Sequence, residues 1–163
     1  DPYLSRGLGD VYKRQEIARR SEDAIDNKFS FPRPMINSND YNFSFSGLKT
    51  HVINKLNKIE LTDECINNVS FELQDSIVDT LISKSLKASQ DHGIKNIVVT
   101  GGVSANKRLR DKFSQVSNCD VFFPDVKFST DNGAMIAYAG FLKSRSSDIE
   151  KNFKIKPNPS LTL

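Results

Sequence analysis

The chain has 163 residues, a formal net charge of +3 and 37% hydrophobic residues, which indicates an ordinary folded domain with its own core. The two cysteines, Cys65 and Cys119, form no CxxC pair, which argues against a disulfide scaffold and a thiolate zinc site. No window of the sequence approaches the length of apolar residues that crosses a membrane. We therefore expect a cytoplasmic protein with no membrane partner. The mildly basic charge is compatible with binding to nucleic acid but does not require it.

The first part of the chain predicts a short helix followed by an extended segment. Residues 1–15 show no sustained period and are expected to be irregular, whereas 16–25 suit a helix. Pro32 and Pro34 bar helix where they stand and disfavour it just before. Alternating aromatic and polar residues over 41–46 then predict a half-buried strand.

The remainder of the chain alternates helical and strand patterns, which predicts an α/β layer with parallel strands. Gly93 stands where a helix C-cap belongs, and β-branched residues after it are typical of a buried strand. Helices are expected over 48–59, 62–90, 104–116 and 132–142, and strands over 94–100 and 120–124.

A glycine pair lies between a predicted strand and a predicted helix. Because Gly101 and Gly102 lack a Cβ, a ligand can approach the backbone, and N–H groups at the helix start can bind it. Asn106, near that start, is placed to hydrogen-bond a ribose hydroxyl or a base edge. The pattern is neither GxGxxG nor a Walker A loop, and a structural turn with Ser104 as N-cap explains it equally well.

Two further stretches have both a structural and a functional interpretation. Asp131 falls at the start of the 132–142 helix, where base rates favour a cap, although its carboxylate is also suited to ligate a cation. Residues 43–50 are either a strand followed by a helix start or a second wall of a polar ligand site. The sequence does not separate these alternatives.

Other polar residues favour structural roles. The only histidines, His51 and His92, form no HxxxH or HExxH pair, so neither is expected to be catalytic. Neither cysteine has the histidine context of a nucleophile. The basic residues between 107 and 112 lack interleaved aromatics, which favours a solvated helix face over a nucleic-acid patch.

Three motifs in this order resemble those of the TsaD/Gcp family: FSFSGLKT at 43–50, GGVSAN at 101–106 and STDNGAMIAYAG at 129–140. Members are tRNA N6-adenosine threonylcarbamoyltransferases, once described as O-sialoglycoprotein endopeptidases; this chain offers no peptidase nucleophile or complete zinc site. The resemblance covers the C-terminal half of the family's length. It implies an α/β, actin-like and sugar-kinase-like (ASKHA) lobe with a mixed sheet flanked by helices.

The resemblance implies a transferase, an acyltransferase of tRNA processing. It would move threonylcarbamoyl from threonylcarbamoyl-adenylate to N6 of adenosine 37 in ANN-decoding tRNAs, forming threonylcarbamoyladenosine. Asn106, with Gly101 and Gly102, matches the motif that binds the adenylate, and Asp131 matches an aspartate ligand of one divalent metal, Fe(2+) or Zn(2+). The other metal ligands are two histidines of an HxxxH motif, which this chain lacks. The implied partners are tRNA, a paralogous scaffold subunit and a small ATPase subunit.

The resemblance also divides the chain into three parts. Residues 1–15 are expected to be a non-native junction, because the family has a glycine-rich turn where 10–15 reads DVYKRQ. Residues 16–143 are the C-terminal part of the actin-like enzyme, and 144–163 are a polar tail. We expect this chain to be inactive alone, and to aggregate or be marginally stable through apolar surface that would face the absent lobe.

Two alternatives to this enzyme remain open. The first is a non-catalytic scaffold or binding paralogue of the same complex, and the presence of Asn106 and Asp131 argues against it. Another actin-fold phosphotransferase, such as a sugar or acetate kinase, is disfavoured because the last two motifs are a more particular pairing than that superfamily shares.

Overall fold

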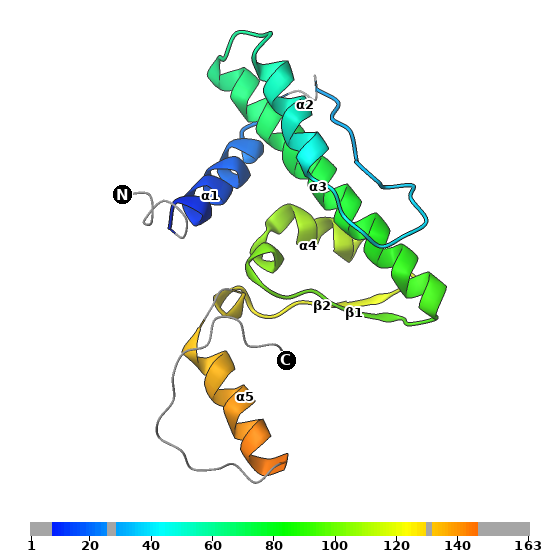
Figure 1. The fold of residues 1–163 in the computed structure, drawn as a ribbon. Coiled ribbons are helices and arrows are strands. Elements are labelled where there is room, and N and C mark those ends of the chain that lie inside the picture. The colour runs from blue at the N-terminus through cyan, green and yellow to red at the C-terminus, as the bar shows by residue number, and fades with distance from the viewer. Residues whose placement is uncertain (1–7, 26–28, 130–131, 147–163) are drawn as a thin grey trace.

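The computed structural model describes residues 8–25, 29–129 and 132–146, which are drawn in colour in Figure 1. They form five α-helices, two short 3-10 helices and one two-stranded sheet. The order is α1 (Leu8–Glu22), α2 (Ser46–Leu56), α3 (Asp63–His92), β1 (Asn96–Val98), η1 (Gly102–Ala105), α4 (Lys107–Ser114), β2 (Asp120–Phe122), η2 (Val126–Phe128) and α5 (Gly133–Ser146).

Helix α3 is the axis of the fold, with α1 and α2 along one part of it and α4 and the sheet along the other (Figure 1). Its start is set by Thr62, whose Oγ1 accepts a hydrogen bond from the Cys65 backbone N at 3.2 Å. Its end is set by Gly93, which adopts a left-handed conformation with φ of 65°. The helix predicted over 62–90 and its glycine cap are confirmed.

Apolar side chains gather in two clusters along α3. The first joins the segment before α2, α2 itself and the beginning of α3, and its buried members are Phe31, Leu48, Val52 and Val69. The second joins the middle of α3, α4 and the sheet, and its buried members are Val78, Leu109 and Phe113.

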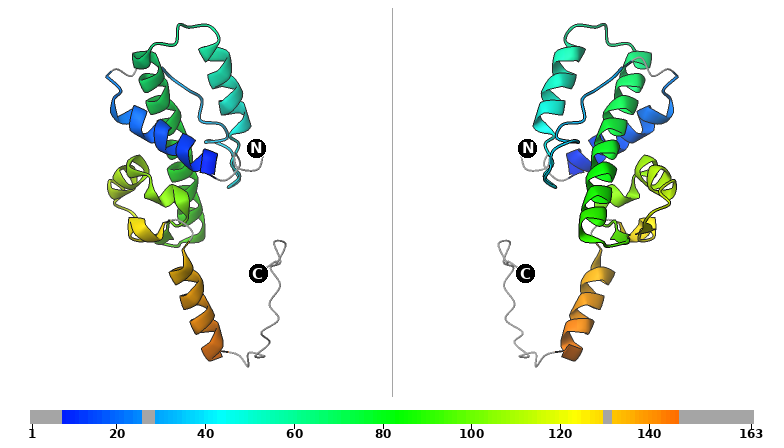
Figure 2. Two further views of the ribbon diagram at one scale, coloured as in Figure 1. Left: turned by 90° about the vertical axis from the view of Figure 1, so that its left-hand side faces the viewer. Right: turned by 90° about the vertical axis from the view of Figure 1, so that its right-hand side faces the viewer.

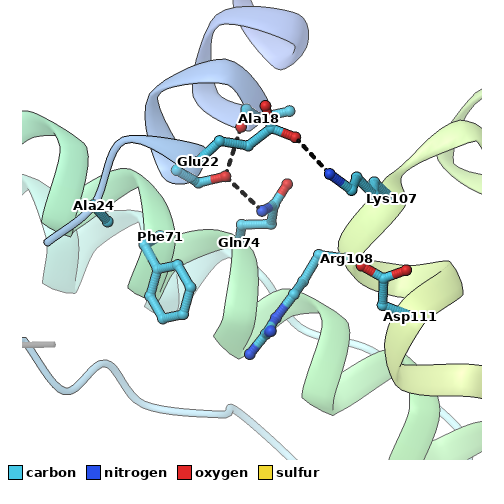
Figure 3. Close-up of a pocket in the computed structure, with 9 residues that line it drawn as sticks. Ala18, Glu22, Ala24, Phe71, Gln74, Lys107, Arg108 and Asp111 are labelled. Carbon is cyan, nitrogen blue, oxygen red and sulfur yellow. Dashed lines mark hydrogen bonds and ion pairs between the residues drawn. The ribbon is translucent and has the colours of Figure 1, made fainter. Parts of the chain in front are cut away.

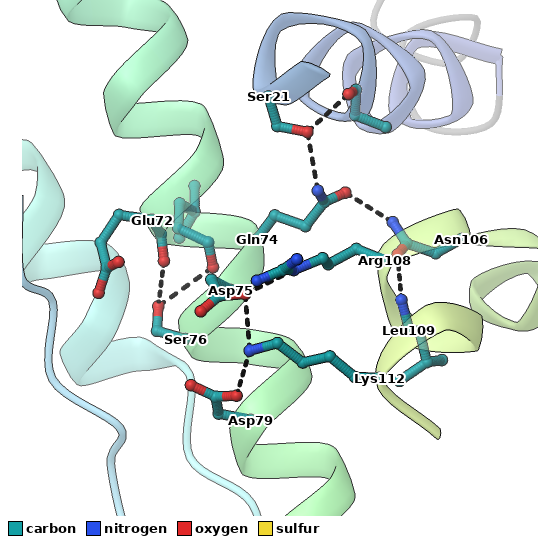
Figure 4. Close-up of polar contacts among 12 residues, drawn as sticks. Ser21, Glu72, Gln74, Asp75, Ser76, Asp79, Asn106, Arg108, Leu109 and Lys112 are labelled. Atoms are coloured by element: carbon teal, nitrogen blue, oxygen red, sulfur yellow. Dashed lines mark hydrogen bonds and ion pairs between the residues drawn. The ribbon is translucent and has the colours of Figure 1, made fainter. Parts of the chain in front are cut away.

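A belt of ion pairs lies between the two clusters and fixes α4 on α3 (Figure 4). Asp75 pairs with Arg108 at 2.8 Å and with Lys112 at 2.7 Å, and Asp79 pairs with Lys112 and with Arg33 at 2.9 Å. Burial acts to raise the pKa of Asp75, but the hydrogen bonds from Lys112 and Arg108 outweigh it and hold that pKa below its ordinary value. The predicted solvated basic face is therefore wrong for these two cations, because α3 supplies carboxylates opposite them.

The segment before α2 is held by a buried lysine, and its described residues 29–45 contain no strand. Lys84, with 1% of its side chain exposed, donates to the backbone O of Ser38 at 3.1 Å and of Asp40 at 2.7 Å. Phe45 is helical in backbone angles, and α2 begins at Ser46. The strand predicted over 41–46 is wrong, because the alternation of aromatic residues meets no partner strand in the described structure.

Helix α1 also departs from the sequence expectation, since it begins at Leu8 and ends at Glu22. The predicted irregular stretch therefore holds part of a helix, and the helix predicted to reach residue 25 is shorter at its end. Arg20 joins α1 to α3 through Asp63 at 3.2 Å. Hydrogen bonds from Arg19 and Arg20 lower the pKa of the exposed Glu16 to about 2.

The sheet is a parallel pair in which Ile97 lies opposite Val121. The parallel pairing is confirmed, but both strands are shorter than predicted, and the described strands do not form the predicted mixed sheet. Val99 and Val121 pack toward the second cluster, whereas Val98 and Phe122 are 70% and 53% exposed. One face of the sheet is covered by helices, and the other presents apolar side chains.

Helix α5 projects away from the rest of the described structure in all three views (Figures 1 and 2). It extends to Ser146, beyond the predicted end at residue 142, so residues 144–146 of the expected tail are helical. Ile136 and Tyr138 are 72% and 64% exposed. No helix within the described ranges is long and apolar enough to cross a membrane.

Candidate functional site

The chain leaves β1 through a turn whose first glycine is required by the backbone. Gly101 has φ of 83° and ψ of 177°, a combination that residues with a Cβ rarely adopt. Gly102 differs, because its φ is not positive and an added Cβ would have nothing within 4 Å. The fold therefore explains Gly101 but gives no reason for Gly102, whose exposed position keeps this surface of the turn open.

Asn106, and not Ser104, caps the helix that follows the turn. A 3-10 turn precedes α4, so the helix begins three residues later than predicted, at Lys107. The Asn106 Oδ1 accepts a hydrogen bond from the Leu109 backbone N at 2.9 Å. The cap holds the Asn106 side chain beside the glycine turn, in a partly buried position.

Ser104 instead connects the glycine turn to the segment that begins the third motif. It is fully buried, and its Oγ donates to the Oγ of Ser129 at 3.0 Å. Arg110 supports the same region, because it donates to the Ser104 carbonyl at 2.6 Å and to the Pro124 carbonyl at 2.7 Å. The structure thus brings the GGVSAN motif against the first residue of the STDNGAMIAYAG motif.

A line of side chains runs from Asn106 across α3 to α1 (Figure 4). The Asn106 Nδ2 donates to the Gln74 Oε1 at 2.7 Å, and the Gln74 Nε2 donates to the Ser21 Oγ at 2.7 Å. Ser21 in turn donates to the backbone O of Ala18 at 2.6 Å. The sequence carries no signal for Gln74, since its partner stands 32 residues away.

Asp131 lies outside the described residues, so its position and its proposed metal role stay predictions. Among the described residues, Asn132 makes a helix-cap contact in this region, since its Oδ1 accepts from the Met135 backbone N at 3.0 Å. Within the described part of the chain, no three His, Cys, Asp or Glu residues are grouped to hold a metal. His51 lies 5.8 Å from the Phe31 ring and His92 lies 5.6 Å from the Tyr41 ring, on different parts of the fold.

A hollow of about 440 Å³ opens between α1, α3 and α4, next to the line of side chains (Figure 3). Its walls include Ser21 and Gln74 but none of the predicted site residues Gly101, Gly102 and Asn106. Two cations reach it, and both are engaged: Lys107 lies 3.4 Å from Glu22, and Arg108 lies over the Phe71 ring. Its remaining walls are Ala18, Glu22, Ala24, Phe71, Lys107, Arg108 and Asp111.

The stretch 43–50 contributes to packing in this structure. Phe45 packs against the first cluster, and Leu48 is one of its buried members. Thr50 donates to the Ser46 carbonyl within α2. The interpretation of this stretch as a second wall of a ligand site stays a prediction.

Comparison with known proteins identifies the family. The model of the family TsaD, described as tRNA N6-adenosine threonylcarbamoyltransferase, matches residues 4–138. A protein of that name from Thermosipho africanus is 39% identical over 151 residues, which is 91% of this chain and 46% of the relative. One from Nitrosomonas europaea is 47% identical, covering 74% of this chain and 37% of the relative. One from Buchnera aphidicola is 38% identical, covering 97% of this chain and 49% of the relative.

The chain therefore spans about half the length, or less, of these relatives. The names of these relatives specify a transferase that acts on tRNA, which agrees with the resemblance carried by the three motifs. The sequence expectation of the family is confirmed, and the chain belongs to the TsaD family of tRNA N6-adenosine threonylcarbamoyltransferases.

Proposed function

We propose that this chain forms the adenylate-binding wall of an enzyme that transfers threonylcarbamoyl from threonylcarbamoyl-adenylate to N6 of adenosine 37 in ANN-decoding tRNAs. The observation that carries the proposal is the turn of Gly101 and Gly102 followed by Asn106 at the N-cap of α4. Membership in the family supports it. In the transfer, the N6 nitrogen bonds to the carbamoyl carbon, the bond from that carbon to the adenylate oxygen breaks, and N6 loses a proton as AMP leaves.

The turn is chemically suited to hold the neutral part of an adenylate. Beyond its bonds to Leu109 and Gln74, the Asn106 carboxamide still has one N–H and one lone pair to offer. One donor and one acceptor side by side match a ribose hydroxyl or the edge of a purine base. Gly102 presents no side chain to a ligand at this turn, so a ring can approach the backbone closely.

The residues of this chain do not by themselves fit the divalent metal, Fe(2+) or Zn(2+), that the family implies. Asp131 is a suitable carboxylate ligand, but His51 and His92 are held against aromatic rings of separate segments. The sequence also contains no HxxxH pair. A single carboxylate does not make a three-ligand site, so we assign no step of the transfer to a metal held by this chain.

The proposal includes the partners that the family resemblance implies. These are tRNA, threonylcarbamoyl-adenylate, a paralogous scaffold subunit and a small ATPase subunit, in the cytoplasm. The ion pairs of Arg108 and Lys112 with α3 leave these cations committed within the chain. We therefore place tRNA contact elsewhere than on the inner face of α4.

A threonylcarbamoyl transfer assay on an ANN-decoding tRNA tests the activity. We expect the full-length Thermosipho africanus relative to modify the tRNA and this chain alone to show no turnover, because it brings an incomplete set of metal ligands. Robust turnover by this chain alone would contradict the incompleteness.

Binding of adenosine to this chain tests the adenylate wall separately. Asn106→Ala removes the hydrogen bonds that the carboxamide offers, and we expect the dissociation constant for adenosine to rise about fivefold. Asn118→Ala, a substitution of an exposed asparagine in the loop after α4, is the matched control and should leave binding unchanged. Equal binding of adenosine by wild type and Asn106→Ala would rule out the proposal that this turn binds the adenylate.

A further inference from the structure

The line of hydrogen bonds from Asn106 to α1 has only one consistent direction. At one end the Leu109 backbone N can only donate, so the Asn106 Oδ1 must face it and the Nδ2 must face Gln74. At the other end the Ala18 carbonyl can only accept, so Ser21 donates there and accepts from the Gln74 Nε2. Two backbone groups of fixed polarity therefore set the orientation of both carboxamides between them.

Gln74 is the member of this line that determines what Asn106 presents to its surroundings. Its Oε1 takes one of the two Nδ2 protons at 2.7 Å, and the cap takes one lone pair of Oδ1. The remaining N–H and the remaining lone pair then have fixed directions. Without Gln74 the cap would still hold Oδ1, but the carboxamide would lose the contact that restrains its rotation.

We propose that Gln74 is a positioning residue for adenylate binding: it holds the Asn106 carboxamide in the orientation in which a donor and an acceptor meet the nucleoside. This inference rests on the proposed function, because it takes Asn106 as the residue that touches the ligand. Gln74 itself acts through Asn106, and its own amide is used by Asn106 and Ser21.

A purely structural role for Gln74 is the alternative, since the same bonds join α1, α3 and α4. The two roles differ in what a conservative replacement restores. Gln74→Glu keeps the acceptor for the Asn106 Nδ2 and removes the donor to Ser21, whereas Gln74→Met keeps the length of the side chain without either bond. Positioning requires the acceptor at Asn106, so the glutamate variant should retain ligand binding and the methionine variant should not.

The experiment is an NMR titration of this whole chain with adenosine, which is uncharged and so insensitive to the charge of a glutamate. We expect Gln74→Met to weaken binding about fivefold and Gln74→Glu to bind within about twofold of wild type. The Asn106 Nδ2 proton that faces Gln74, recorded without ligand, should lose its hydrogen-bonded chemical shift in Gln74→Met and keep a hydrogen-bonded chemical shift in Gln74→Glu. Gln90→Met, an exposed glutamine on the same helix, is the control and should change neither measurement.

The outcomes separate the two proposals. If Asn106→Ala weakens adenosine binding and Gln74→Met does not, the role of Gln74 is overturned while the proposed function stands. If wild type fails to bind adenosine, or Asn106→Ala binds it equally well, the adenylate wall is overturned and the role of Gln74 with it. If Gln74→Glu is as weak as Gln74→Met although both chains stay folded, the acceptor is not what matters and the positioning role is overturned.

Discussion

Two regions of the molecule differ in chemistry. The first is the interface of α3 with its neighbours, and the second comprises α5 and the outer face of the sheet. At the first, carboxylates of α3 meet the cations Arg33, Arg108 and Lys112 at 2.5 to 3.6 Å. Among the described residues, every buried side-chain nitrogen or oxygen has a hydrogen-bond partner. On the second, apolar side chains such as Ile136 and Val98 are 72% and 70% exposed.

The difference shows which part of the fold is complete within this chain. Polar groups at the α3 interface lose water but gain partners from the same chain, so their burial is compensated. The apolar side chains of α5 and of the outer sheet face remain in contact with water, which gives no stabilisation by burial. We therefore expect substitutions at the α3 interface to change stability strongly and substitutions on α5 to change it little.

The substitution expected to lower the free energy of unfolding most is Arg33→Ala. Arg33 donates to Glu72 at 2.6 Å, to Asp79 at 2.9 Å and to the Phe31 carbonyl at 2.8 Å. Burial acts to lower the pKa of Arg33, but the bonds to Asp79 and Glu72 outweigh it and raise that pKa. Because Glu72 is buried, losing its charged donor is costly, and we expect about 3 kcal/mol less free energy of unfolding in urea denaturation.

Arg19→Ala is the matched control for that loss. Arg19 pairs with Glu16 at 2.8 Å on the surface of α1, where both side chains are at least half exposed. Water competes for such a pair, so the free energy of unfolding should stay close to that of wild type. Equal losses in the two variants would show that the α3 interface does not depend on its ion pairs.

The sequence predicted α3 well, because its signals are local. Thr62 at the start and Gly93 at the end each act within one turn of the helix, and both work in the structure as predicted. The predicted strand over 41–46 failed for the opposite reason. Alternation of residues is compatible with any extended segment. The residues just before this one, Ser38 and Asp40, are held by Lys84, which lies 46 and 44 residues later in the chain.

In the candidate site, too, local features were predicted from the sequence and contacts between distant residues were not. The glycine pair predicted a turn, and Gly101 confirms it through its backbone conformation. The start of the next helix was misplaced because a 3-10 turn of four residues intervenes before Asn106 takes the cap. Gln74 was out of reach, since a glutamine on a long helix has no local mark that distinguishes it from a solvated residue.

The second largest expected loss of stability is at the glycine turn between β1 and α4. Gly101→Ala places a Cβ on a backbone with φ of 83°, and we expect about 2 kcal/mol less free energy of unfolding. Gly102→Ala meets open space and should cost no more than about 0.5 kcal/mol. Urea denaturation measures both, and a loss at Gly102 as large as that at Gly101 would contradict the geometry of the turn.

The same pair of variants sharpens the distinction between fold and site. In the adenosine titration, Gly102→Ala should weaken binding although the chain stays as stable as wild type, because its methyl group occupies the surface left open for the ligand. Unchanged binding would leave Gly102 without a role in the site.

The smallest expected change in stability is that of Ile136→Ser on α5. With 72% of Ile136 exposed, its loss should alter the free energy of unfolding by less than about 0.5 kcal/mol. The apolar surface itself should be detectable, because an exposed patch of this kind binds a hydrophobic fluorescent dye and promotes association. We expect Ile136→Ser to lower both dye fluorescence and the fraction of aggregates in sedimentation.

Ile53→Ser on α2 makes the same chemical change at a residue that is 46% exposed in the other region. Since three of its four neighbours one helical turn away are polar, namely Lys49, Thr50 and Asn57, dye binding should change less than in Ile136→Ser. A fall in stability of Ile136→Ser beyond about 1 kcal/mol would mean that α5 packs against the rest of the chain in solution. The α3 interface and α5 would then no longer differ in this respect, because both would be stabilised by contacts within the chain.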